Sequence, residues 1–318
     1  MFTNIAGLLV IIALAVLFGW LVWRAWRAKN VAVKWIGTIL SGLLTLVLVA
    51  ISVLALVGLV KMNTRRGNPV REIQIEGTAE QVSRGEHLAN AFCVDCHSLN
   101  GEFPMTGGRD LAKDLPMPLG NFVSVNLTPA GPLKDWSDGE ILRVLREGVD
   151  RNGRPLVIMA NTNVRYMSNE DLESVIAFMR SQPAVENQTP EPPDKPNLLA
   201  AILLGAGLLP EGQAPVTGTI TAPPKEVNAE YGKYVVSYQD CTSCHGPDLN
   251  GGRQGQMAPI GPSLRVVKGW TQEQFLNTFR TGVDPNGLVL KDPMPWKAIG
   301  RLDEVELGAL YMYLKSLP

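Results

Sequence analysis

The sequence predicts an all-α protein in which two membrane-spanning helices precede two tandem copies of one small helical domain. Three observations predict this fold. Two long apolar segments begin the chain, one pattern of motifs then occurs twice, and each copy holds a cysteine–histidine motif with no strand pattern around it. The expected segments are 1–62 for the two membrane helices, 63–77 for a stalk, 78–183 for the first domain, 184–227 for a Pro-rich linker and 228–318 for the second domain.

The N-terminal segments are long enough to cross a bilayer. Ile5–Trp23 is a run of 19 residues without a charge, and Trp35–Val60 is a run of 26. A helix needs about 20 apolar residues for one crossing, so we expect transmembrane helices at about 5–26 and 35–60. A secretory signal peptide is the alternative for the first run, but no Lys or Arg precedes it and no A-x-A site follows it. We therefore expect the chain to keep its Met1.

Basic residues predict the orientation of this helical pair. The turn between the helices carries Arg24, Arg27, Lys29 and Lys34. Positive loops stay in the cytoplasm, so the remainder of the chain is expected on the periplasmic side of a bacterial cytoplasmic membrane. A second basic group follows the second helix, and we expect it either to contact lipid phosphates or a partner, or to form a solvated stalk. Its members are Lys61, Arg65, Arg66 and Arg71.

The net charge of −1 conceals an asymmetry between the two parts of the chain. Residues 1–77 carry +6 and residues 78–318 carry −7. A mildly acidic extramembrane part excludes a nucleic-acid-binding role and is compatible with a basic docking partner.

The repeated pentapeptides Cys93–His97 and Cys241–His245 contain every cysteine of the chain. C-x-x-C-H is the attachment signal of c-type haem, in which both thiols form thioethers and the imidazole ligates the iron. The sequence therefore predicts two covalently bound haem c groups. The expected thioether residues are Cys93, Cys96, Cys241 and Cys244, and the expected proximal ligands are His97 and His245.

Other cysteine chemistries fit these pentapeptides poorly. A zinc ribbon needs two C-x-x-C pairs about 15–20 residues apart, whereas 144 residues separate Cys96 from Cys241. A thioredoxin-type dithiol needs a βαβ context. Two disulfides would leave both trailing histidines without a role.

The soluble region repeats its order of helices. In each copy a tryptophan, Trp136 or Trp270, precedes an arginine by ten residues, and a Gly-Val-Asp-x-Asn-Gly turn follows. Such matched offsets indicate duplication. Each tryptophan is expected either near a haem propionate or in the core, and Ser137 and Thr271 are expected helix N-caps. The expected helices are 81–92 and 229–240, then 137–147 and 271–281, then 171–183 and 306–318.

The linker contains one apolar stretch, Leu198–Leu209, among many prolines. Twelve apolar residues are too few to span a bilayer. We expect a short helix that covers one of the domains, or a contact with the membrane surface or a partner subunit.

The expected proximal histidines need support, and the irons need sixth ligands. A carbonyl that accepts the outer ring N–H fixes the orientation of a ligating histidine, and Pro262 is the candidate for His245, with Pro118 for His97. The one further histidine, His87, lies ten residues before His97 on the same helix and is not expected to reach the opposite haem face.

Methionine is therefore the expected sixth ligand in both copies. Met294 is flanked by prolines, which stiffen its loop, and Met159 occupies the corresponding place in the first copy. Met105, Met117 and Met167 are alternatives to Met159, because methionine also fills gaps in cores.

Both halves resemble class I cytochromes c, over about residues 80–318. The run Gly120–Leu156 resembles the first domain of the cytochrome subunits of bacterial membrane-bound alcohol and sugar dehydrogenases. The resemblance implies two tandem class I cytochrome c domains. The chain departs from that family in having Ala160 in place of a proline after Met159, and two haem domains behind a helical pair where three follow a signal peptide.

The expected function is single-electron relay, because a haem with histidine and methionine ligands has no open site for a substrate. We expect a dihaem subunit of a membrane respiratory or photosynthetic complex, not itself an enzyme, which passes electrons between a quinol- or substrate-oxidising partner and a soluble carrier or terminal oxidase. The alternative is a dihaem enzyme of peroxidase type with one open haem. A haem-based sensor would need an output domain.

Small residues at four-residue spacing, Gly37, Ser41 and Thr45, predict close helix packing in the membrane. The packing partner is either the first helix or another integral subunit. Integral membrane subunits and a soluble redox protein are thus the expected partners.

Overall fold

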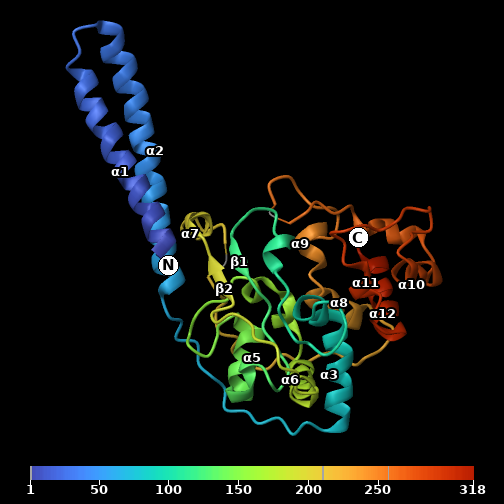
Figure 1. Ribbon diagram of the computed structural model, residues 1–318. Helices are drawn as coiled ribbons and strands as arrows, with labels where there is room; N and C mark the ends of the chain where they lie inside the picture. The colour runs from blue at the N-terminus through green and yellow to red at the C-terminus, as the bar shows by residue number, and fades with distance from the viewer. Residues whose placement is uncertain (1, 210, 257) are drawn as a thin grey trace.

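The computed structural model describes residues 2–209, 211–256 and 258–318, so Met1, the first residue of the expected segment 1–62, lies outside the described residues. A long arm of two helices projects from a mostly helical body (Figure 1). The body contains a first unit, residues 78–183, and a second unit, residues 228–318. The chain between them returns across the first unit before it reaches the second.

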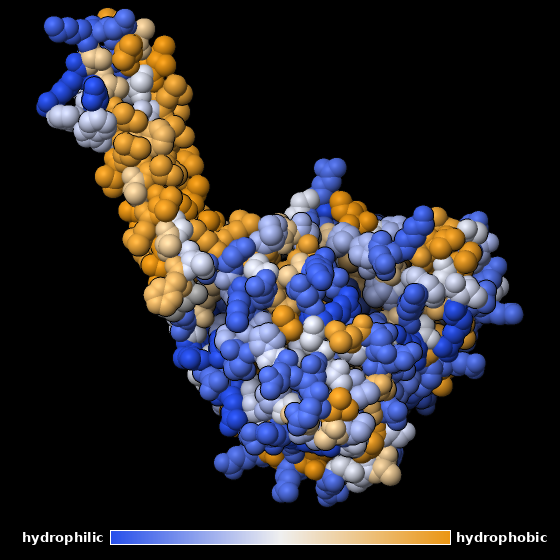
Figure 2. Space-filling model, in the orientation of Figure 1, coloured by the Kyte–Doolittle hydropathy of each residue, from blue (hydrophilic) through white to orange (hydrophobic). Residues whose placement is uncertain are grey.

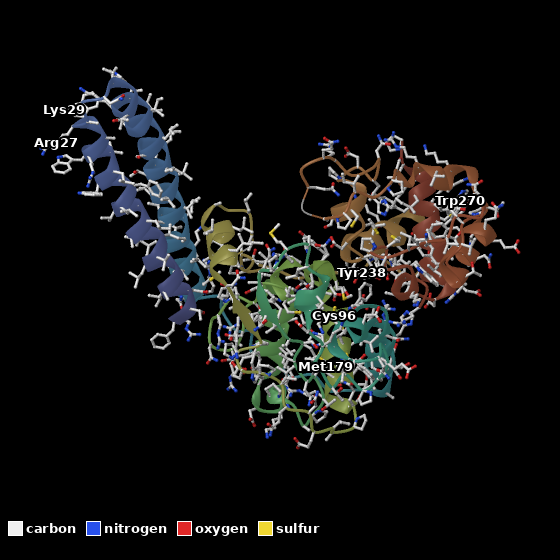
Figure 3. All side chains as sticks on the ribbon, turned by 45° about the horizontal axis from the view of Figure 1, so that its top comes forward. Arg27, Lys29, Cys96, Met179, Tyr238 and Trp270 are labelled. Atoms are coloured by element: carbon white, nitrogen blue, oxygen red, sulfur yellow. The ribbon has the colours of Figure 1, made fainter. Side chains whose placement is uncertain are left out.

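The arm consists of α1 (Phe2–Trp26) and α2 (Val31–Asn63), both long and apolar enough to cross a membrane. Each helix begins a few residues before its predicted start. The Asn30 side chain caps α2 by accepting the Ala32 and Val33 N–H groups. The basic turn lies at the tip of the arm, far from the body, as Arg27 and Lys29 show (Figure 3).

The second basic group contacts the body of the protein itself. The Arg65 guanidinium donates to the Asn152 carbonyl at 3.0 Å, and Arg71 donates to the carbonyl of Val216 at 2.6 Å. Residues 64–78 thus run extended along the first unit. These contacts are within the chain. The sequence predicts contacts with lipid phosphates or a partner, or a solvated stalk, and does not predict these contacts.

The first unit places its helices in the predicted order, with short 3₁₀ turns between them. Its elements are α3 (Ala79–Phe92), α4 (Val94–His97), η1 (Leu111–Asp114), η2 (Pro132–Asp135), α5 (Asp138–Glu147), η3 (Met159–Asn161), η4 (Asn163–Tyr166) and α6 (Asn169–Ser181). The predicted cap is confirmed, because the Ser137 hydroxyl accepts the Glu140 N–H.

The second unit follows the same order. Its elements are α8 (Ala229–Tyr238), α9 (Cys241–His245), η5 (Leu264–Gly269), α10 (Gln272–Thr281), α11 (Trp296–Ile299) and α12 (Glu304–Ser316). Thr271 caps α10 as predicted, with its hydroxyl accepting the Gln274 N–H.

The first and last helices of each unit pack through one glycine. A Cβ added at Gly85 on α3 would lie 1.9 Å from the Ser174 carbonyl oxygen on α6. A Cβ added at Gly232 on α8 would lie 1.9 Å from the Ala309 carbonyl oxygen on α12. Only glycine allows backbones to approach so closely, so both units have the same helix crossing.

The linker is more structured than its proline content predicted. Strand β2 (Asp194–Pro196) pairs antiparallel with β1 (Gly120–Phe122) of the first unit, and α7 (Leu198–Gly205) follows. The described residues are mostly helical, and this two-stranded ribbon is their departure from the all-α expectation. The expected short helix in Leu198–Leu209 is confirmed.

Candidate haem-binding sites

The first cysteine motif lies where α3 ends. The Cys93 N–H continues the helical hydrogen bonding to the Ala89 carbonyl at 2.8 Å, and the single turn of α4 returns the His97 N–H to the Cys93 carbonyl at 2.9 Å. This turn brings the two thiols and the imidazole to one side of a shared cavity.

A backbone carbonyl orients the imidazole of His97, as expected, but it belongs to a different residue. His97 Nδ1 lies 2.9 Å from the Val125 carbonyl oxygen, which leaves Nε2 available to a metal. The prediction of Pro118 was wrong, because its carbonyl accepts the Asn197 side-chain amide at 2.7 Å. Burial lowers the pKa of His97, against the raising effect of the Val125 bond, and so favours the neutral, metal-ligating imidazole.

The cavity beside His97 is large and mostly apolar. Its empty volume, including the part open to solvent, is about 1170 Å³. Cys93, Cys96, His97, Trp136 and Met159 all line it. An apolar cavity with two thiols, an imidazole and a thioether fits a covalently attached haem. Trp136 lines this cavity and also packs against the main core, so its contact with a propionate stays a prediction.

The position of Met159 distinguishes it from its three alternatives. Met105 and Met167 are buried in the main core, and Met117 packs against a separate apolar cluster. Of these four methionines, Met159 alone lines the cavity, and it does so from the turn η3. This position favours Met159 over Met105, Met117 and Met167 as the sixth ligand of the first site.

The second motif occupies α9, after a left-handed Asp240 that separates it from α8. His245 Nδ1 lies 2.6 Å from the Pro262 carbonyl oxygen, so this predicted support is confirmed. A Cβ added at Gly261 would lie 2.7 Å from His245 Nδ1. The glycine before Pro262 therefore permits the close approach of the ring.

Met294 follows a turn of the same kind as the one before Met159. The Leu156 N–H donates to the Gly148 carbonyl at 2.7 Å, and in the second unit the Leu290 N–H donates to the Gly282 carbonyl at 2.7 Å. Met159 follows Leu156 by three residues, and Met294 follows Leu290 by four.

In both units an equivalent arginine binds the chain a few residues after the methionine. Arg146 donates to the Met167 carbonyl at 2.5 Å, and Arg280 donates to the Leu302 carbonyl at 3.1 Å. Met167 follows Met159 by eight positions, and Leu302 follows Met294 by eight positions. The two methionines are thus equivalent by their backbone surroundings.

Reactive dithiol chemistry is disfavoured at both motifs. Burial raises the pKa of Cys93 to about 12, and burial raises that of Cys241 to about 12, with the Asp240 carboxylate adding to the second shift. An unmodified thiol with such a pKa is protonated at neutral pH and is a poor nucleophile.

The two motifs lie close to the boundary between the units. The rings of Phe92 and Tyr238, which end α3 and α8, meet edge to face at 5.1 Å. Figure 3 shows Tyr238 between the two units. Arg301 of the second unit donates to the Asp95 carboxylate inside the first motif at 2.8 Å. Asn163 of the first unit donates to Asp240 beside the second motif at 2.7 Å.

A buried polar cluster completes this boundary. Arg84 on α3 bonds Asp171 of its own unit at 2.9 Å and Glu306 of the second unit at 2.7 Å. Sequence reasoning assigned no role to these residues, since contacts between distant segments carry no local periodicity. The repeat itself was the available signal, because Asp171 and Glu306 are both third residues of their helices.

Comparison with known proteins supports a cytochrome c assignment for part of the chain. Residues 229–318 match the cytochrome c family. One of the subunits of nicotinate dehydrogenase from Pseudomonas putida is 27% identical over 266 residues, which are 76% of this chain and 22% of that protein. The gluconate 2-dehydrogenase cytochrome c subunit of Pantoea cypripedii is 36% identical over 101 residues, which are 30% of this chain and 22% of that protein.

The chain therefore contains a cytochrome c domain and is similar to cytochrome c subunits of dehydrogenases. The expected likeness to such subunits is confirmed at this level. The matched region spans about a fifth of the length of these two relatives.

Proposed function

We propose that this chain is a dihaem c-type cytochrome subunit that relays single electrons at a membrane. Two class I cytochrome c domains, at 78–183 and 228–318, each hold one covalent haem c. The observation that carries the proposal is the paired geometry of the two units. In each unit, a C-x-x-C-H histidine is oriented by a carbonyl and a methionine lies in the equivalent register.

Each haem supplies a reversible one-electron iron couple when it is bound. Cys93 and Cys96 attach the first haem, and Cys241 and Cys244 attach the second. The Val125 and Pro262 carbonyls hold their histidines with Nε2 directed away from the backbone. The lining of the first cavity is mostly apolar, which suits the haem ring.

Ligation of the iron by a methionine sulfur favours electron transfer over chemistry on a substrate. His97 with Met159, and His245 with Met294, would be the protein ligands of the two irons. A methionine ligand raises the reduction potential, and a filled axial position excludes substrate. The chain is thus not the catalytic subunit of its complex, in agreement with a relative named as a dehydrogenase cytochrome c subunit.

The arm would anchor this relay in the bacterial cytoplasmic membrane as a multi-pass hairpin. Its basic tip favours the cytoplasm, which leaves both haem domains on the periplasmic side. Integral subunits of a dehydrogenase or respiratory complex would be the donors, and a soluble carrier or a terminal oxidase would accept the electrons.

A reductive titration tests the proposal against the alternative of a peroxidase-like dihaem enzyme. We expect two one-electron steps, a sulfur-to-iron band near 700 nm in the oxidised protein, and no binding of carbon monoxide by the reduced protein. Rapid carbon monoxide binding at one haem would instead indicate an open iron and would contradict the relay.

A further inference from the structure

Helix α7 packs against the body-side half of α2 with almost no space between the backbones. A Cβ added at Gly58 would lie 1.7 Å from the Ala201 carbonyl oxygen, and one added at Gly205 would lie 1.9 Å from the Leu54 carbonyl oxygen. Interfaces of small residues are typical of helices that associate within a membrane.

Polar contacts fix both ends of α7 to the arm. The Asn4 side chain on α1 donates to the Pro196 carbonyl at 2.9 Å, just before α7 begins. After α7 ends, Glu211 forms ion pairs with Lys61 and Arg66, the latter at 2.8 Å. The helix is therefore attached to both arm helices where they meet the body.

The position of α7 along α2 sets its depth in a bilayer. No charged residue lies between Lys34 and Lys61. At 1.5 Å per residue, the apolar core of a bilayer takes roughly 20 residues of such a helix. A core centred on this segment ends near Gly58, so α7 lies at the boundary between the acyl chains and the headgroups.

The outer face of α7 and the turn after it is apolar and exposed. Leu199 is 38% exposed and Leu208 is 56% exposed. Figure 2 shows that the apolar surface of the arm continues onto the body at this junction, whereas most of the body is hydrophilic. Exposed leucines that continue a membrane surface fit acyl chains.

The inner face of α7 connects this surface to the first haem site. Ala200 and Leu204 belong to an apolar cluster that also contacts Cys96 and Ile158. Cys96 and Ile158 line the cavity beside His97. Helix α7 is thus one layer of side chains from the first cavity.

We propose that α7 is an interfacial membrane helix, with its leucines among the acyl chains of the outer leaflet. This contact fixes the first haem site close to the membrane surface. The inference rests on the proposed insertion of the arm in a bilayer. Binding of a helix at the membrane interface strengthens with the apolar area that it buries there.

The test uses the full holoprotein in phospholipid nanodiscs and three single variants, L208C, V47C and L288C. The haem cysteines are thioethers, so each variant carries one free thiol. Val47 lies mid-arm and is 54% exposed, and Leu288 lies in the second unit and is 64% exposed. The thiol at position 208 should react with an aqueous maleimide about tenfold more slowly than that at 288, because acyl chains surround it.

A photoactivatable phosphatidylcholine with a diazirine in its acyl chain provides the second readout. We expect lipid adducts on the peptide that contains Leu199 and Leu208. Reaction at 208 as fast as at 288, with 47 protected, would overturn the inference and leave the arm in the membrane. Protection without adducts would indicate that position 208 is buried against protein and not among lipids, and would also overturn the inference. Reaction at 47 would refute the membrane arm itself.

Discussion

His87 and Tyr234 make the same contact in opposite directions across the boundary between the two units. His87 Nε2 lies 2.6 Å from Glu306 at the start of α12, and the Tyr234 hydroxyl donates to Asp171 at the start of α6 at 2.5 Å. Each lies two residues after the glycine at which the first and last helices of its unit cross, Gly85 or Gly232. The units therefore associate as the two halves of a symmetric dimer do.

Removal of the Glu306 charge should weaken this association. The Glu306 side chain is fully buried, and loss of one partner from a buried ion pair costs roughly 3 kcal/mol. We expect the free energy of unfolding of E306Q to fall by about that amount, as measured by denaturant titration followed by circular dichroism. The neighbouring exposed Glu304 provides the matched control E304Q, which should be neutral. Equal stability of both variants would contradict the account.

Acid should abolish the same contribution. Burial raises the pKa of Glu306, but bonds from His87 and Arg84 outweigh burial and lower it to about 2. The group therefore stabilises the fold above its usual pKa of 4.5, and this stabilisation is lost as the pH falls from 4.5 towards 2. The difference in unfolding free energy between wild type and E306Q should shrink over that range, and a constant difference would contradict the assignment.

Replacement of Met159 should open one iron. In M159A the oxidised protein should lose about half of its band near 700 nm, and one reduced haem should bind carbon monoxide. The control is M167L, because the equivalent position of the second unit is Leu302 and methionine-to-leucine exchanges are tolerated in cores. An unchanged band in M159A would show that another residue ligates the first haem.

Arg301 should affect electron exchange between the haems without altering either haem. Its bonds to Asp95 and to the Asn90 carbonyl at 2.9 Å tie the second unit to the first motif. In R301Q we expect slower inter-haem exchange after a rapid reductive pulse, with unchanged absorption spectra. K297Q, at an exposed residue of α11, should exchange at the wild-type rate. Equal rates in R301Q and K297Q would show that this contact does not position the haems.

Asp194 should make the potential of the first haem depend on pH. It lines the cavity and accepts the Val157 N–H at 2.7 Å, and burial raises its pKa to about 6. As the pH rises through 6, the new negative charge favours the oxidised iron, so the midpoint potential should fall. D194N should remove this step, whereas the more exposed Glu191 in the same cavity provides the control E191Q. A step that persists in D194N would assign it to another group.

Local patterns predicted those parts of the molecule that local chemistry decides. The helix caps Ser137 and Thr271 follow from hydroxyls before amphipathic runs, and Pro262 follows from its Gly-Pro turn. Val125 was missed because the first unit has no matching Gly-Pro, so its carbonyl is supplied by the segment after β1.

Contacts between distant segments were beyond local patterns. The pairing of β2 with β1 joins residues more than 70 positions apart, and Arg84 reaches Glu306 across 222 positions. Neither contact produces periodicity in the sequence. Because the two units repeat one pattern, however, each residue at their boundary is expected to have a counterpart at the equivalent position of the other unit.

The intact mass of the purified chain tests the central claim most directly. The account predicts a mass increase of two haem groups for the wild type, and of one group for each double variant, C93A/C96A and C241A/C244A. A wild-type chain that carries fewer than two haems, or a double variant that keeps both, would contradict it.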